Sequence, residues 1–156
     1  MKKSWREKLD ADKGLPRIGV ATGRLAARWG GGRFVIPAPR EVDALMKQVP
    51  RGRLVTVNEL RLALARRHHA DFACPLTTGI FCWIAAHAAA EEEAAGRKQI
   101  TPFWRTLKTG GEINPKYPGG AAGVARRLRA EGHPIRRQGK RFIVAGFEKV
   151  LFDHFT

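Results

Sequence analysis

Two helical stretches that follow one another, with a short break between them, constrain the fold of this chain most. In the first, "LVTVNELRLALARRHH", Thr56 is placed as an N-cap with Glu59 three positions on, which forms a capping box. The second is predicted to begin at Thr77 or Thr78, to run through "GIFCWIAAHAAAEEEAA" and to stop at Gly96. Two helices joined by a turn, the second rich in small residues, predict a helix-turn-helix.

Further elements are predicted on both sides of this helix pair. "APREVDALMKQV" has apolar residues at helical spacing, namely Val42, Leu45, Met46 and Val49. A helix is expected across 121–130, and "HPIRRQGKRFIVAGF" after it holds two β-prone runs around Gln138-Gly139, a pattern typical of a hairpin. The sequence therefore predicts a mainly α fold with a small β-hairpin, arranged as a winged helix-turn-helix domain.

Residues 1–36 are expected to be a basic, Gly/Arg-rich N-terminal extension, and residues 37–156 the compact domain. Three consecutive glycines at 30–32 stop any helix, and a strand is predicted at Arg33–Ile36. The rest of the extension is expected to be a flexible arm that holds phosphates without sequence preference.

The charge of the chain indicates its partner. Twenty-nine Lys and Arg against fourteen Asp and Glu leave a net charge of +15. Such an excess favours a polyanionic partner, above all nucleic acid, although high charge can also serve solubility alone. The sequence holds no apolar run near the ~18 residues of a membrane span and no apolar core after its basic start. We expect a monomeric cytoplasmic protein, associated with the nucleoid and not with a membrane.

Four segments in order carry a resemblance to a known family: "VPRGRLVTVNELRLAL", the small-residue helix, "TPFWRTL" and "YPGG…RRLRAEG". Together they resemble the C-terminal domain of the alkylguanine-DNA alkyltransferases (methylated-DNA–protein-cysteine methyltransferases). The chain is most similar in kind to their cysteine-lacking relatives, the alkyltransferase-like proteins. The resemblance covers Pro39–Gly132. It implies a DNA-binding domain that holds a flipped or alkylated base in duplex DNA and recruits other DNA-repair proteins.

The departures from the family pattern concern the reaction. In the family motif P-C-H-R-V, Pro102 and Arg105 match, but Phe103 stands at the alkyl-accepting cysteine and Trp104 at its histidine partner. Alkyl transfer needs a cysteine whose proton a neighbouring His can relay away. The resemblance therefore implies a protein without a catalytic residue or cofactor. Val57 replaces a tyrosine that helps to rotate the nucleotide, and the arginine that fills the base stack falls near Leu76.

Two sets of site residues follow from this alignment and from the charge pattern. The predicted lesion pocket consists of Val57, Phe103, Trp104, Tyr117, Pro118 and Gly119. The predicted DNA contacts are Arg51, Arg53, Thr77, Thr78, Arg105, Arg126, Arg127, Arg136, Arg137, Lys140 and Arg141. Because 68–96 contains no Lys or Arg, we expect weak sequence specificity and a steep salt dependence.

Three alternatives stay open at this point. The first is an alkyl-transferring enzyme that uses Cys74 as its acceptor, displaced from the position that the family uses. Cys74 lies just before the predicted second helix, with His68 and His69 a few residues upstream. Phe103 and Trp104 can instead be core residues. The protein can also be a nucleoid-type binder of DNA or RNA with a vestigial pocket. His68, His69, Asp71, Cys74 and Cys82 match no zinc spacing, so no metal site is predicted.

Overall fold

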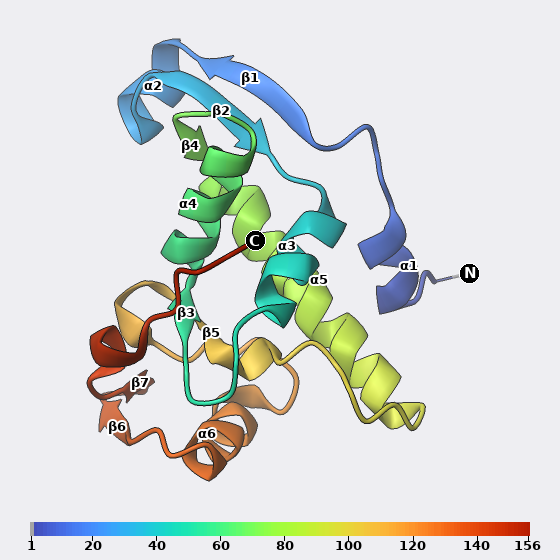
Figure 1. The fold of residues 1–156 in the computed structure, drawn as a ribbon, viewed down its shortest axis with the longest axis vertical. Coiled ribbons are helices and arrows are strands. Elements are labelled where there is room, and N and C mark those ends of the chain that lie inside the picture. Colours follow the sequence, from blue (N-terminus) through green and yellow to red (C-terminus); the bar gives the residue numbers. More distant parts are fainter. Residues whose placement is uncertain (1) are drawn as a thin grey trace.

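A helix of 20 residues, α5 (Pro75–Ala94), runs through the middle of the molecule (Figure 1). The structure is a computed structural model and describes residues 2–156. Helices α1 (Trp5–Asp10), α3 (Pro39–Lys47) and α4 (Val57–Arg67) pack against α5. The fold is mainly helical with small sheets, as predicted. In the described residues, no helix is both long enough and apolar enough to cross a membrane.

The predicted capping box opens α4. The backbone N–H of Thr56 donates to Glu59 Oε1 at 2.6 Å, and the N–H of Asn58 donates to Thr56 Oγ1 at 3.2 Å. These bonds satisfy amide groups that have no partner inside the first helical turn. The helix then buries Leu60 and Leu64 against its neighbours, so the prediction for this element is confirmed.

Helix α5 begins earlier than predicted. Pro75 occupies its first turn, where the missing N–H of proline costs nothing. Thr78 is not a cap, because it lies inside the helix and its hydroxyl donates to the Cys74 carbonyl oxygen at 2.7 Å. The short strand β4 (Phe72–Ala73) separates α4 from α5. The predicted pair of consecutive helices is therefore present, with the start of the second corrected to Pro75.

Three small sheets complete the fold. The first has the order β1-β2-β4, with β1 (Arg17–Ala21) antiparallel to β2 (Gly32–Ile36) and β2 parallel to β4. In the second, β3 (Val55–Thr56) pairs in parallel with β5 (Thr106–Leu107). The third is the predicted hairpin, β6 (Ile135–Gln138) and β7 (Arg141–Val144), which follows α6 (Gly120–Ala130).

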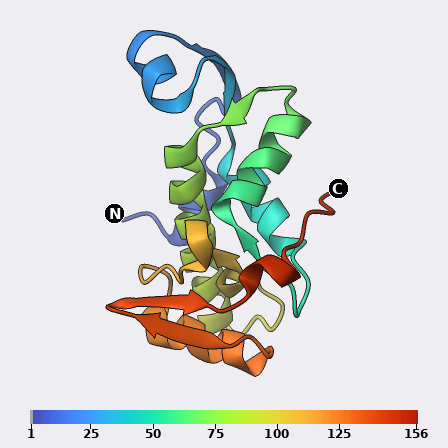
Figure 2. The same ribbon diagram turned by 90° about the vertical axis from the view of Figure 1, so that its left-hand side faces the viewer.

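The hairpin turn is displaced by one residue from its predicted place. Gln138 pairs with Arg141, so the turn consists of Gly139 and Lys140. Gly139 has φ +63°, in the left-handed region that favours glycine. Figure 2 shows the hairpin projecting from one end of the molecule.

The N-terminal segment is folded, which corrects the expectation of a flexible arm. Leu9 of α1 and Val35 of β2 are buried in the core cluster. The N–H groups of Trp5 and Arg6 each donate to the Glu91 carboxylate at 3.1 Å, which ties the start of α1 to α5. The strand predicted at Arg33–Ile36 is confirmed as β2, and α2 (Gly23–Trp29) ends before the glycines. The domain boundary at residue 36 stays a prediction.

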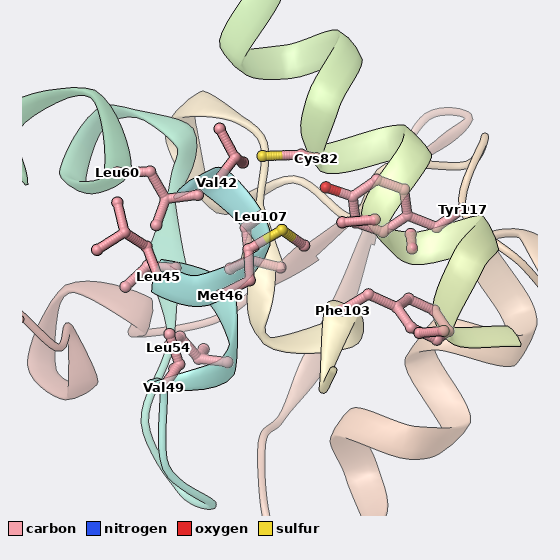
Figure 3. Packing of buried hydrophobic residues seen from close by; sticks show 14 of the residues in the cluster. Val42, Leu45, Met46, Val49, Leu54, Leu60, Cys82, Phe103, Leu107 and Tyr117 are labelled. Atoms are coloured by element: carbon pink, nitrogen blue, oxygen red, sulfur yellow. The ribbon is translucent and has the colours of Figure 1, made fainter. Parts of the chain in front are cut away.

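The core lies where α3, α4 and α5 meet the segment that carries three 3₁₀ turns, η1 (Phe103–Arg105), η2 (Thr109–Gly111) and η3 (Phe147–Val150). Figure 3 shows Leu45 and Met46 of α3 on one side and Phe103 and Tyr117 on the other. All four side chains are at most 3% exposed. The aromatic segment is thus part of the core that holds the helices together.

Candidate nucleic-acid interface

Phe103 is a core residue. Its side chain is 0% exposed, and its ring packs edge-on against Trp104 and Tyr117, with ring centroids 5.2 and 6.0 Å away. Edge-to-face contacts at these distances stabilise aromatic clusters. The position that aligns with the family's acceptor cysteine therefore faces the interior, which corrects its prediction as a lesion-pocket residue.

Trp104 and Arg105 are held by one carboxylate. The Trp104 Nε1–H donates to Glu131 Oε2 at 2.9 Å, while Arg105 donates through Nε and Nη2 to the two Glu131 oxygens at 2.9 and 2.8 Å. Arg105 Nη1 also donates to the Val49 carbonyl at 2.9 Å. Burial alone would raise the pKa of Glu131, but the hydrogen bonds from Arg105 and Trp104 outweigh it and hold this pKa below its usual value.

These bonds correct two predictions. The Arg105 side chain is 14% exposed and uses both edges of its guanidinium inside the protein, so it cannot serve as a DNA contact in this conformation. Arg127 stacks on Trp104, with its guanidinium carbon 4.5 Å from the ring centroid, and pairs with Glu93 at 2.6 Å. Trp104 is therefore enclosed between Glu131 and Arg127 and forms no wall of a base pocket.

Because His133 is buried, we expect the protein to lose stability in mild acid. It is 6% exposed, and its Nε2 has no hydrogen-bond partner among residues 2–156. Burial lowers the pKa of His133 from its ordinary 6.5, an effect that the charge of Glu131 opposes and that of Arg105 supports. The unfolded chain then takes up the proton at higher pH than the folded protein. The stabilisation that depends on neutral His133 is therefore fully present above pH 6.5, and it is lost as the pH drops from there toward the pKa of His133 in the folded protein.

We expect the midpoint of urea unfolding to be lower at about pH 5.5 than at about pH 7.5. The variant His133→Gln should show a smaller difference between the two conditions, because it cannot take up this proton. Equal differences in the wild type and the variant would contradict the assignment to His133.

Neither cysteine is placed to accept an alkyl group. Burial raises the pKa of Cys82 to about 12, although a hydrogen bond with Tyr117 opposes this, so its thiol stays protonated. Cys74 is 4% exposed, and no side-chain hydrogen bond to its sulfur is found in the described part of the chain. His68, a few residues upstream of Cys74, bonds to Glu41 through Nε2 at 2.5 Å. A reactive thiol must be accessible, and Cys74 is buried although it is the N-cap residue of α5.

A pocket of about 690 Å³ lies beside the N-terminal half of α5, which is within the size range of ligand-binding pockets. The start of α4 contributes Val57, α5 contributes Leu76, Ile80 and Trp83, and the segment after β5 contributes Lys108, Lys116 and Tyr117. Leu76 and Ile80 are 64% and 42% exposed, which is unusual for large apolar side chains. The pocket thus has apolar walls and two lysines.

The structure brings together only part of the predicted lesion pocket. Val57 and Tyr117 line the pocket, whereas Phe103, Trp104, Pro118 and Gly119 do not. Gly119 instead precedes α6 with φ +87°, in the left-handed region. The sequence analysis did not predict Ile80, Trp83, Lys108 or Lys116 as pocket residues. The Lys and Asn residues of "KTGGEINPK" could have indicated the wall of the pocket that lies opposite α5.

The remaining residues predicted to contact DNA differ in their exposure and in the bonds that their side chains already form within the protein. Arg126, Arg136, Arg137, Lys140 and Arg141 are exposed, although Arg141 pairs with Glu112 at 3.1 Å. Arg51 donates to the Ala130 carbonyl at 3.0 Å, and Arg53 donates to the Val150 and Leu151 carbonyls. Thr77 is half-buried. Thr78 is fully buried and cannot reach DNA, so its prediction as a DNA contact is wrong. Among the predicted contacts, the exposed cations without an ion pair or a side-chain hydrogen bond to another element of residues 2–156 are therefore Arg126 of α6 and Arg136, Arg137 and Lys140 of the hairpin.

These elements define a class of small helical domain, in which a helix pair carries an open pocket and a β-hairpin follows the last helix. The particular arrangement is the alkyltransferase-like fold. A crystal structure of the S. pombe alkyltransferase-like protein in complex with DNA is similar at a TM-score of 0.52 and 17% identity, over 73% of this chain and 93% of that chain. The resemblance that the motifs indicated is confirmed as a resemblance of fold.

A second structure of the S. pombe protein, in complex with damaged DNA containing O6-carboxymethylguanine, has a TM-score of 0.48 and 16% identity over the same shares of the two chains. The sequence matches no protein-family model and no curated protein.

Proposed function

We propose that this protein binds duplex DNA and holds an extrahelical base in the pocket beside α5, without transferring an alkyl group. The observation that carries the proposal is the open apolar pocket at the exposed start of α5, on a fold shared with a protein whose structure contains DNA. An extruded base needs apolar or aromatic surfaces to stack on. Val57, Leu76, Ile80 and Trp83 supply such surfaces.

The charges around the pocket suit the DNA backbone. Lys108 and Lys116 line the pocket and are exposed. Cations at this rim would contact phosphates beside the extruded nucleotide, which fixes the register of the protein on the duplex. The helix itself presents Leu76 and Ile80 where base-reading side chains would stand, so these contacts carry little sequence information.

The position of the candidate nucleophiles supports binding without transfer. The thiols of Cys74 and Cys82 are buried, and neither lines the pocket. Phe103 occupies the position that the resemblance assigns to the acceptor, and it lies in the core. Intact-mass measurement after incubation with alkylated duplex should therefore show an unmodified protein, and an adduct abolished by Cys74→Ser would contradict this.

A second candidate function is a nucleoid-type binder in which the pocket holds no base. It is favoured by the placement of Phe103 and Trp104 outside the pocket and by a net charge of +15. Binding would then depend on phosphate contacts alone.

Fluorescence-anisotropy titration tests the proposal with two variants of matched chemistry. Leu76→Glu places a carboxylate at the pocket and should weaken binding by about tenfold or more, roughly 1.4 kcal/mol. The control Leu62→Glu changes a leucine of similar exposure, 56%, on α4 beside the C-terminal tail, and should leave affinity within about twofold.

The duplexes are used with and without one alkylated guanine, at two salt concentrations. We expect tighter binding to the alkylated duplex that survives the higher salt. Equal binding that collapses with salt would support the nucleoid-type function instead, and equal effects of the two variants would place the DNA elsewhere on the protein.

A further inference from the structure

Residues 17–36, which form β1, α2 and β2, make up a prong at one end of the molecule (Figure 1). The prong contains four arginines and no acidic residue: Arg17, Arg24, Arg28 and Arg33. All four are exposed. Their guanidinium groups form no ion pair and no hydrogen bond within the described residues, unlike those of Arg105, Arg127 and Arg141. One carboxylate lies at the base of the prong, where Asp71 accepts the backbone N–H of Arg33 at 2.8 Å. The prong therefore carries a net positive charge.

The prong is fixed to the start of α5. Strand β2 pairs in parallel with β4, which leads directly into that helix. The Arg33 carbonyl accepts the N–H of Asp71, and the Val35 carbonyl accepts the N–H of Cys74, both at 2.9 Å. Because Cys74 immediately precedes α5, the prong has a defined position relative to the pocket.

Aromatic packing stiffens the prong itself. The rings of Phe34 in β2 and Phe72 in β4 stack with centroids 5.7 Å apart, and Trp29 of α2 packs edge-on against both, at 6.4 and 6.2 Å. Gly19 of β1 lies so close to the Phe34 ring that a Cβ there would stand 2.7 Å from it. A rigid element loses less conformational entropy on binding than a flexible one.

The prong and the β6–β7 hairpin lie at opposite ends of the molecule's longest axis, with α5 between them (Figure 1). In Figure 2 both project toward the side on which α5 lies, away from the C-terminus. A rod-shaped polyanion laid along this long axis would meet exposed arginines near both ends, since Arg136 and Arg137 of the hairpin are exposed as well, with side-chain hydrogen bonds only inside the hairpin.

We propose that the prong binds the phosphodiester backbone of duplex DNA that flanks the pocket, as a second anchor opposite the hairpin. This inference rests on the proposed function. Four arginines whose guanidinium groups are unpaired, with the single carboxylate of Asp71 bonded to backbone at the base of the prong, fit a uniform polyanion better than a protein surface of mixed charge. Val20 and Leu25, 65% and 40% exposed, add apolar surface that suits deoxyribose.

Duplex length separates this inference from the function it rests on. The variant Arg24→Ala/Arg28→Ala removes two charges from α2, where both residues are exposed and alanine favours the helix. Binding is measured by anisotropy over a salt series with duplexes of about 10 and about 25 base pairs, that is, one helical turn and more than two. The control Arg66→Ala/Lys149→Ala removes two exposed charges from α4 and η3.

On the long duplex we expect the variant to bind several-fold more weakly than the wild type. The slope of log K against log salt should fall by about 2, or about 0.9 for each lost phosphate contact. On the short duplex the variant, the control and the wild type should agree, because the DNA ends before the prong.

Unchanged affinity and slope on the long duplex would overturn the prong proposal alone. An equal loss on both lengths would also overturn it, because the arginines would then act at the pocket. If the wild type binds neither duplex, the proposed function fails and the prong proposal fails with it.

Discussion

Replacing Glu131 with alanine is expected to lower the free energy of unfolding by about 3–5 kcal/mol, the usual cost of removing one partner from a buried ion pair. The Glu131 side chain is 5% exposed and accepts hydrogen bonds from Trp104 and Arg105. Without it, the Arg105 guanidinium keeps only its bond to the Val49 carbonyl. The Trp104 indole N–H also loses its acceptor in a half-buried site.

The matched control is Glu93→Ala, which removes an acceptor from Arg127 at a similar distance, 2.6 Å. Glu93 is 45% exposed, and exposed ion pairs contribute at most about 1 kcal/mol. Urea denaturation of the two variants measures both effects. If Glu131→Ala were as mild as Glu93→Ala, the Trp104–Arg105–Glu131 cluster would not be a structural element of the core.

Local patterns in the sequence were sufficient to predict most of the helices. The capping residues Thr56 and Glu59 interact across three positions, and the apolar spacing of Val42, Leu45 and Met46 reports one helix face. The hairpin was predictable for the same reason, because Gly139 and its β-prone neighbours act within a few residues. Each of these features depends on nearby parts of the chain.

Partners that are distant in sequence could not be predicted. Arg105 meets its carboxylate 26 residues later, and β2 pairs with β4 across 38 residues. No local feature of "TPFWRTL" states whether Phe103 and Trp104 point into a cleft or into the core. The side chains that line the pocket come from the start of α4, from α5 and from the segment after β5, which are far apart in the sequence.

Introducing a thiol at the aligned acceptor position is expected not to create an alkyltransferase. Phe103→Cys should lower the free energy of unfolding by about 3 kcal/mol, because it removes most of a fully buried ring. The new thiol would stay behind Tyr117, which lines the pocket and also packs against Phe103. Trp104 donates its only polar hydrogen to Glu131 and cannot take up the thiol proton.

The measurement is intact mass after incubation with alkylated duplex, together with the rate of labelling by a soluble maleimide. Val57→Cys is the matched control, because residue 57 lines the pocket and is only half-buried. We expect rapid labelling of Val57→Cys, and labelling of Phe103→Cys no faster than that of the two buried native cysteines. An alkyl adduct on Phe103→Cys would mean that residue 103 reaches the pocket. The protein would then hold a damaged base against η1, the segment whose Phe103 is fully buried in this structure.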